Sequence, residues 1–296
     1  MLEETLSILV DPVTKEPLKI SIEEKVQKEV IKGILSNDAG TKYLIQNSIA
    51  NLIPKDEDMK IKFDLYNVWQ ELQKNGLLLY EKFPELNLSI KERKDVKSFQ
   101  NFCSFYGNVL DIGCGPKIPA YLENNKIEFA VGIDPLLSFK PKSNEKIELI
   151  QAIGELLPFE KGVFDMVCFA TSFDHVMLPE LVLNETKRVV KKGGFVIFWI
   201  EEDPNKKLSL RTRAARKARN TLFSKFLKKS VQYENDVREQ NSIVEILRTP
   251  SGAADKFHIN HIQYNTLNEI CESKGFKKKS IRQSSNKKSV FVKYQI

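Results

Sequence analysis

Between residues 107 and 200, short apolar runs alternate with helical or loop segments, and the same alternation resumes near residue 262. Apolar runs of this length, bounded by turn residues, predict buried strands, and strands that alternate with helices predict a mainly parallel sheet. The pattern therefore predicts an α/β fold with a seven-stranded, mainly parallel sheet and helices on both faces. The expected strands span residues 108–112, 129–133, 147–151, 166–170, 195–200, 276–283 and 289–295.

Four further segments carry apolar side chains at the spacing of one helix face. Leu65, Val68, Trp69 and Leu72 mark the first of them. Glycine stands shortly after the last three, at Gly107, Gly193 and Gly275, as is usual past a helix C-terminus. We expect helices over 61–82, 93–105, 181–190 and 267–274, with the first two covering one edge of the sheet.

The chain divides into three parts by pattern. Residues 1–56 alternate polar turns with short apolar segments, which predicts a small β-rich unit. Its expected short strands span residues 6–10, 18–22, 31–35, 43–45 and 49–53. Residues 57–106 form a helical cap or linker, and residues 107–296 form the main domain. A basic insertion at 201–255 interrupts that domain and contains an apolar helical stripe between Leu208 and Leu227.

Composition narrows the class of protein. The net charge of +7 permits an anionic partner but does not require one. Four cysteines are widely spaced without a C-x-x-C pair, so neither a disulfide framework nor a zinc site is expected. There is no run of about 18 apolar residues, and the first residues carry acids where a signal peptide has Lys or Arg. We expect a cytoplasmic protein without a transmembrane segment.

The main chemical motif is residues 109–116 (VLDIGCGP), at the end of the first strand of the main domain. Gly113 and Gly115 let the backbone approach a ligand closely, and Asp111 can accept hydrogen bonds from a cationic group. The next strand ends at Asp134, where a carboxylate can bind the two hydroxyls of a ribose. A glycine turn with an acid at the next strand end predicts a nucleoside-containing ligand.

The third glycine of a dinucleotide motif is missing, because Ile118 stands in its place. Asp111 also adds negative charge beside the turn, which suits a sulfonium and an amino group better than a pyrophosphate. The motif therefore favours S-adenosylmethionine over a nicotinamide dinucleotide.

Four motifs in order resemble the Rossmann-like class I methyltransferase family, across about 107–200 and 256–296. Besides the two strand ends, residues 152–159 (AIGELLPF) with 162–167 (GVFDMV) and residues 184–194 (NETKRVVKKGG) carry the resemblance. The resemblance implies a methyltransferase with S-adenosylmethionine as cofactor. Family roles fall on Asp111, Gly113 and Gly115 for the methionine end, Asp134 for the ribose, Ile153 and Gly154 for the adenine, and Thr171 and Phe173 for the transfer cavity.

Two positions depart from the family pattern. Lys117 stands where many relatives have a glycine, and Ile153 stands where many have an acid that binds the adenine amino group. Asp165 begins a strand, and we expect a structural role for it.

His175 is the best candidate for a general base, because it follows the fourth strand of the main domain in residues 171–176 (TSFDHV). Asp174 could orient it or contact the substrate. The alternative is that His175 caps or packs the next helix. His258 and His261 form an H-x-x-H pair without a carboxylate or cysteine at ligand spacing, so no metal site is expected.

Residues 8–18 and 43–54 resemble a small zinc-ribbon-like family that includes the activator subunit of several tRNA and protein methyltransferases. The positions that match its cysteines are Asp11, Thr14, Ser36 and Ala39. With no thiolate ligand left, the resemblance implies a structural or substrate-shaping unit without zinc.

The acceptor is not named by the sequence. Between Lys206 and Lys229 there are ten Lys or Arg and no acids, which suits a lid over an anionic acceptor, a membrane- or RNA-binding helix, or a solvated face. The first interpretation is methyl transfer to a small-molecule or glycan-type acceptor, anionic or phosphorylated ones included. The alternatives are a ribosomal or transfer RNA methyltransferase and a catalytically inactive methyltransferase-like partner. The oligomeric state is left open.

Overall fold

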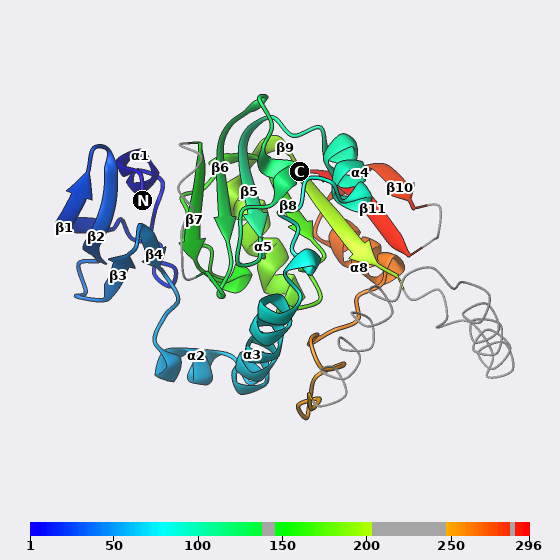
Figure 1. Ribbon diagram of the computed structural model, residues 1–296, viewed down its shortest axis with the longest axis horizontal. Helices are drawn as coiled ribbons and strands as arrows, with labels where there is room; N and C mark the ends of the chain where they lie inside the picture. The colour runs from blue at the N-terminus through cyan, green and yellow to red at the C-terminus, as the bar shows by residue number, and fades with distance from the viewer. Residues whose placement is uncertain (138–145, 203–246, 285–287) are drawn as a thin grey trace, which may run out of the picture.

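The structure is a computed structural model that describes residues 1–137, 146–202, 247–284 and 288–296. One mixed sheet runs through these residues in the order β1-β2-β3-β4-β7-β6-β5-β8-β9-β11-β10 (Figure 1). Its strands are β1 (Lys19–Val26), β2 (Glu29–Ser36), β3 (Lys42–Gln46), β4 (Ile49–Asn51), β5 (Gly107–Ile112), β6 (Ile127–Ile133), β7 (Ile147–Gln151), β8 (Phe164–Ala170), β9 (Val190–Glu201), β10 (Lys277–Gln283) and β11 (Ser289–Gln295).

Each of the seven strands expected in the main domain is present as β5 to β11. Strands β7, β6, β5, β8 and β9 pair in parallel, and β11 pairs antiparallel with both β9 and β10. The predicted seven-stranded sheet was nevertheless wrong in extent, because the sheet has eleven strands. The reason is that β4 pairs in parallel with β7, through Ala50 opposite Ile150, and thereby joins β1–β4 to the main sheet.

The N-terminal segment lies on the same core as the main domain. The run Leu6–Val10, expected as a strand, is instead the end of α1 (Glu3–Leu6) followed by a turn with isolated bridges, one of them from Leu9 to Phe159. Lys15 reaches across to the main domain, where its ammonium donates to the Leu157 carbonyl (3.1 Å) and to Glu185 (2.6 Å).

Helices cover both faces of the sheet. Helix α4 (Lys94–Cys103) and the short 3₁₀ turn η2 (Ala120–Leu122) pack on one face, in a core that includes Phe99 and Tyr121. Helices α5 (Pro179–Val189) and α8 (Tyr264–Ser273) pack on the other face, where Val182 and Leu267 are fully buried. These positions match the expected helices at 93–105, 181–190 and 267–274.

Helices α2 (Asp56–Lys62) and α3 (Tyr66–Lys82) lie beyond the ends of β6 and β7 to which the arrowheads point (Figure 1). The 3₁₀ turn η1 (Pro84–Leu86) follows, and η3 (Gly154–Leu156) lies between β7 and β8. Tyr66, Trp69 and Leu72 of α3 share a buried cluster with Ile153 and Ile259. Residues 57–106 therefore cover the carboxyl ends of the strands as well as one sheet face.

Much of the predicted insertion at 201–255, including its basic stretch, lies outside the described residues. Within the described ranges, no helix has the length and apolar character needed to cross a membrane. Asp165 has the structural role that its position at the start of β8 suggested. Its carboxylate accepts the Asn108 N–H (2.8 Å) and the Lys191 ammonium (2.8 Å).

Candidate functional site

A cavity of about 560 Å³ lies at the carboxyl ends of the parallel strands. One part of its lining comes from the residues that follow β5, β6 and β7, namely Gly113, Asp134 and Ile153. The other part comes from the loop after β8 and from residues 257–261. Ligands of open parallel sheets bind at this edge, where the strand order reverses on either side of β5.

The glycine turn after β5 has the backbone geometry that the sequence motif requires. Gly113 and Gly115 have φ values of +79° and +77°, and a Cβ on Gly113 would lie 2.4 Å from the Ser172 Cβ. A Cβ on Gly115 would face open space, with the Tyr80 hydroxyl at 3.9 Å as its nearest neighbour. The turn leads into the three-residue η2 and not into a long helix, so it offers no helix N-terminus for a pyrophosphate.

Asp134 ends β6 at the cavity wall and is 7% exposed. Its two carboxylate oxygens accept the N–H groups of Gly115 and Leu136, each at 2.8 Å, and this fixes the carboxylate against the glycine turn. Burial raises the pKa of Asp134 to about 6, against the two backbone hydrogen bonds, which lower it. Each oxygen keeps acceptor capacity for a ligand hydroxyl.

Asp111 lies deeper than the motif suggested. Its carboxylate is fully buried and accepts the Tyr121 hydroxyl (2.7 Å) and the Cys168 thiol (3.3 Å). Burial raises its pKa to about 7. It is not among the residues that line the described cavity, so its assignment to the methionine end stays a prediction.

The segment after β7 brings Ile153 and Gly154 to the cavity wall, where the sequence expected the adenine. Glu155 follows them and is buried, and its carboxylate accepts the N–H groups of Met177 (2.6 Å) and Leu178 (3.2 Å). Glu155 thereby ties the segment after β7 to the loop that precedes α5.

The loop after β8 begins with a strained residue. Thr171 has a φ of +60° and lines the cavity, and its assignment to the transfer cavity stays a prediction. Phe173 does not line it, which corrects the sequence assignment. Its ring is 3% exposed and packs edge-on against Phe169 and Phe198, each at 5.1 Å between ring centroids, because the loop turns this side chain back into the core.

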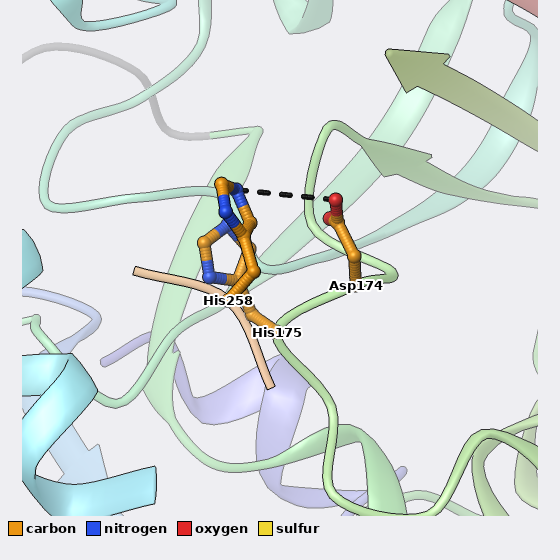
Figure 2. Close-up of side chains that lie close together, drawn as sticks. All are labelled: Asp174, His175 and His258. Atoms are coloured by element: carbon orange, nitrogen blue, oxygen red, sulfur yellow. Dashed lines mark ion pairs between the residues drawn. The ribbon is translucent and has the colours of Figure 1, made fainter. Parts of the chain in front are cut away.

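Asp174, His175 and His258 line the cavity and lie close together (Figure 2). The His175 Nδ1 lies 3.0 Å from the Phe257 carbonyl oxygen. A carbonyl only accepts, so Nδ1 carries the proton and the lone pair is on Nε2. Burial lowers the pKa of His175, and the charge of His258 lowers it further.

His258 stands between two carboxylates. Its Nδ1 is 2.9 Å from Asp255, and its Nε2 is 3.9 Å from Asp174. Burial alone would lower the pKa of His258, but the hydrogen bond to Asp255 and the charge of Asp174 outweigh burial and raise it. His261 reaches the same Asp255 carboxylate at 3.3 Å.

The sequence analysis missed two parts of this site. Asp255 stands three residues before His258, so the segment reads D-x-x-H-x-x-H, and that spacing was an available signal. The second part is helix α3, whose residues Trp69, Gly76 and Tyr80 line the cavity from outside the strand ends. Only the packing of α3 against the strand ends reveals this role.

Asp11, one of the positions matched to zinc ligands, is a buried hydrogen-bond centre. One carboxylate oxygen accepts the N–H groups of Val13 (2.8 Å) and Thr14 (2.9 Å). The other accepts the Asn37 amide (2.9 Å) and the Tyr43 hydroxyl (3.0 Å). Hydrogen bonds thus join the two turns that the matched positions mark, and the resemblance to a zinc ribbon is not confirmed.

Residues 110–198 match the model of a family described as a methyltransferase domain. The match begins in β5 and ends in β9, so it contains the glycine turn, Asp134 and the loop with His175. It agrees with the methyltransferase domain that the sequence motifs predicted.

Curated relatives match shorter stretches. An uncharacterised protein of Methanocaldococcus jannaschii is 32% identical over 93 residues, which are 31% of this chain and 36% of that protein. The sarcosine/dimethylglycine N-methyltransferase of Halorhodospira halochloris is 44% identical over 52 residues, 18% of this chain and 19% of the enzyme. The matched stretches thus span about a third of the length of the first relative and about a fifth of the second.

Solved structures match more of the chain at lower identity. A methyltransferase of Aquifex aeolicus, described as SAM-dependent, covers 73% of this chain and 97% of its own, with 15% identity and a TM-score of 0.42.

Proposed function

We propose that this chain, which carries a methyltransferase domain at residues 110–198, uses S-adenosylmethionine to methylate a small molecule or the end of a glycan inside the cavity. One observation carries the proposal. A single cavity joins Gly113, Asp134 and Ile153, at the strand ends where a nucleoside fits, to Asp174 and His175. A cofactor and an acceptor can therefore meet in one space.

The residues of the first part fit the cofactor. The Asp134 carboxylate, fixed by two backbone N–H groups, would accept hydrogen bonds from the ribose hydroxyls. Ile153 and Gly154 would flank the adenine, and the open side of Gly115 would admit the methionine portion. When bound, the cofactor supplies an electrophilic methyl group on a sulfonium.

The chain's own contribution is positioning, because methyl transfer needs the acceptor held in line with the methyl group. Helix α3 covers the strand ends with Trp69 and Tyr80 and limits the entry of water. We assign Asp174 and His175 to the acceptor, since both line the cavity and carry groups that can contact a substrate.

The charge of the lining bears on the acceptor. The described lining residues include five acids, Asp134, Glu155, Asp174, Glu201 and Glu202, and Arg93 is the one Lys or Arg among them. Carboxylates repel an anion in a low-dielectric site. The described wall therefore gives no support to a phosphorylated acceptor, and the basic stretch that suggested one lies outside the described residues.

The experiment that tests this function is calorimetric titration of the full chain with S-adenosylmethionine and S-adenosylhomocysteine. We expect micromolar binding that Asp134→Ala abolishes, while Asp38→Ala, at an exposed carboxylate of β2–β3, leaves it unchanged. If neither ligand binds a folded wild-type chain, the proposal is wrong and an inactive partner protein is favoured.

The RNA alternative has its own signature. RNA binding would be strongly salt-dependent, because the affinity would come from released counterions. We expect weak binding of a structured RNA at physiological salt, without a requirement for the cofactor. Cofactor-dependent RNA binding that falls steeply with salt would favour an RNA methyltransferase.

A further inference from the structure

All three histidines of this 296-residue chain line the cavity and lie next to one another. His175 comes from the loop after β8, and His258 and His261 come from the segment before α8. The rings of His175 and His258 lie 4.5 Å apart between centroids, and those of His258 and His261 lie 5.8 Å apart. Because imidazoles are common metal ligands and proton carriers, this cluster of histidines in the cavity lining indicates a chemical role.

We infer that Asp174, His175 and His258 bind a first-row divalent metal ion such as Zn²⁺ or Fe²⁺. Each offers a ligand atom, and these atoms all lie within 4.8 Å of one another (Figure 2). Two imidazoles and one carboxylate are a common ligand set for catalytic zinc and non-haem iron, and they leave coordination positions open for a substrate.

The hydrogen bonds around the two imidazoles fit this role. In metal sites a ligating histidine donates its other N–H to a carbonyl or a carboxylate, which fixes the ring and its tautomer. His175 Nδ1 lies 3.0 Å from the Phe257 carbonyl, and His258 Nδ1 lies 2.9 Å from Asp255. Both rings thus keep Nε2 as the nitrogen for an ion.

The carboxylate of Asp174 is also placed for an ion. The distance from an Asp174 carboxylate oxygen to the His258 Nε2 is 3.9 Å, which is too long for a hydrogen bond. This distance is compatible with two ligand atoms bound to the same ion. Within the described ranges, no hydrogen bond to the Asp174 carboxylate is found. An ion at this point would offset the negative charge of Asp174 and of Glu201, whose carboxylates interact electrostatically.

A second group, Asp255 with His258 and His261, is the weaker candidate. The Asp255 carboxylate already accepts the N–H groups of Phe257 (2.7 Å) and His258 (2.9 Å) and holds the His258 ring. The oxygen lone pairs of Asp255 are therefore used in hydrogen bonds that fix the His258 segment and ring. Asp255 is therefore the residue that orients His258, and Asp174 is the ligand.

The sequence alone pointed away from a metal, since no carboxylate was recognised beside the H-x-x-H pair. The fold supplies one from a distant segment, because Asp174 stands 84 residues before His258 and the Asn260 N–H donates to its carbonyl (3.0 Å). That contact and the amide of Asn260 on the Val176 carbonyl (2.9 Å) hold the two segments together.

The metal site itself does not depend on the proposed function, but the role of the ion in methyl transfer rests on it. A divalent ion lowers the pKa of a hydroxyl that binds it, so the hydroxyl proton can pass to solvent without a protein base. The ion also brings positive charge to an acidic wall. The acceptor class that follows is an oxygen nucleophile, a hydroxyl with a second oxygen able to chelate.

Metal binding can be measured without cofactor or acceptor. Tag-free full chain, stripped with a chelator, is titrated with Zn²⁺ by calorimetry and with Co²⁺ by visible absorption. We expect one equivalent per chain, and a loss of at least about tenfold in affinity for His258→Ala and for Asp174→Asn. Asp255→Asn should weaken binding by about 10- to 100-fold, as expected for an orienting partner.

His261→Ala is the matched control, because His261 belongs only to the second group, and its affinity for Zn²⁺ should stay close to that of wild type. Loss of binding in His261→Ala but not in Asp174→Asn would overturn the assignment of the ligands. No stoichiometric binding of either ion to wild type would overturn the site itself.

Titration with S-adenosylhomocysteine separates the two proposals and checks that each variant is folded. If the chain binds S-adenosylhomocysteine but no metal ion, the metal site is refuted, and His175 stays the candidate base for the proposed reaction. If the chain binds the metal ion but not S-adenosylhomocysteine, the metal site is supported and the proposed methyl-transfer function is refuted.

Discussion

Two buried carboxylates at neighbouring strand ends, Asp111 and Asp134, differ in their partners. Asp134 faces the cavity and is held by backbone N–H groups, whereas Asp111 is held by a hydroxyl and a thiol inside the core. Burial raises both pKa values, to about 6 and about 7. Each acid therefore changes charge in an accessible pH range, with a different consequence.

Cofactor affinity should fall below the pKa of Asp134. A ribose hydroxyl donates to the ionised carboxylate, and protonation removes charge and acceptor capacity. We expect S-adenosylhomocysteine to bind about tenfold more weakly at pH 5 than at pH 7, since a pKa near 6 leaves about a tenth of the groups ionised at pH 5. Calorimetry at both pH values measures this.

Asp134→Asn is the control for that titration, because the amide does not ionise. Its weaker affinity should change much less between pH 5 and pH 7. If the affinity of the variant changes with pH as much as that of wild type, the group that titrates is not Asp134.

The stability of the free protein should depend on Asp111 with the opposite sign. A group whose pKa is higher in the folded state stabilises the fold below its unfolded value of 3.8, and the contribution is lost as pH rises through about 7. Asp111→Asn removes the cost of the buried charge. We expect its melting temperature to exceed that of wild type at pH 8 and the difference to shrink toward pH 5.

The same variant decides the predicted role of Asp111 at the methionine end. Unchanged affinity for S-adenosylhomocysteine would limit Asp111 to supporting the turn through Tyr121 and Cys168. A melting temperature of Asp111→Asn below that of wild type at pH 8 would contradict the burial argument.

At the scale of elements, the loops after β5 to β8 and helix α3 enclose the cavity together. Gly76 lies in the middle of α3 and faces the cavity, and a Cβ there would have an ordinary contact with the Leu136 side chain at 3.9 Å. Glycine inside a helix costs about 0.5–1 kcal/mol relative to alanine. Gly76 therefore lowers the stability of helix α3 but leaves the adjacent part of the cavity free of a side chain.

Gly76→Ala should raise the free energy of unfolding by about 0.5–1 kcal/mol and keep cofactor binding. Gly76→Leu should also keep the helix, because leucine is a good helix former, but its side chain would enter the cavity. We expect the leucine variant to bind S-adenosylhomocysteine at least about tenfold more weakly, a cost of about 1.4 kcal/mol. Equal affinity in both variants would mean that α3 does not bound the ligand site.

At the scale of the whole molecule, residues 1–56 share a sheet with the methyltransferase domain. Lys15 is a bridge between the two parts, and its ammonium donates to the Pro12 and Leu157 carbonyls and to Glu185. Burial lowers the pKa of Lys15, against the pairing with Glu185, which raises it. We interpret residues 1–56 as a unit that folds cooperatively with the main domain.

Lys15→Met should lower the free energy of unfolding by about 1–3 kcal/mol, because two carbonyls and a carboxylate lose a charged donor. Thermal unfolding should remain a single transition at a lower temperature. Lys19→Met removes an exposed pair with Asp38 and should change stability little. Two separated transitions in wild type would show that residues 1–56 unfold independently.

The sequence by itself determined the local elements and several residues that line the cavity at the strand ends. Strands β5 to β9 and β11 follow from apolar runs, because burial demands apolar residues, whereas the edge strand β10 is polar and exposed throughout. Gly113, Gly115 and Asp134 could be recognised because their roles depend on backbone conformation and strand order, which are encoded locally. Leu6–Val10 failed as a strand because a short apolar run does not distinguish a strand from a buried turn.

Only the tertiary structure decided which distant groups meet. The sheet is longer than predicted because β4 pairs with β7, a contact between segments about a hundred residues apart that no local pattern encodes. Phe173 turns into the core, α3 covers the strand ends, and Asp174 meets His258 for the same reason. Periodicity reports which face of an element is buried, whereas the partner of that face is set by the packing of the whole chain.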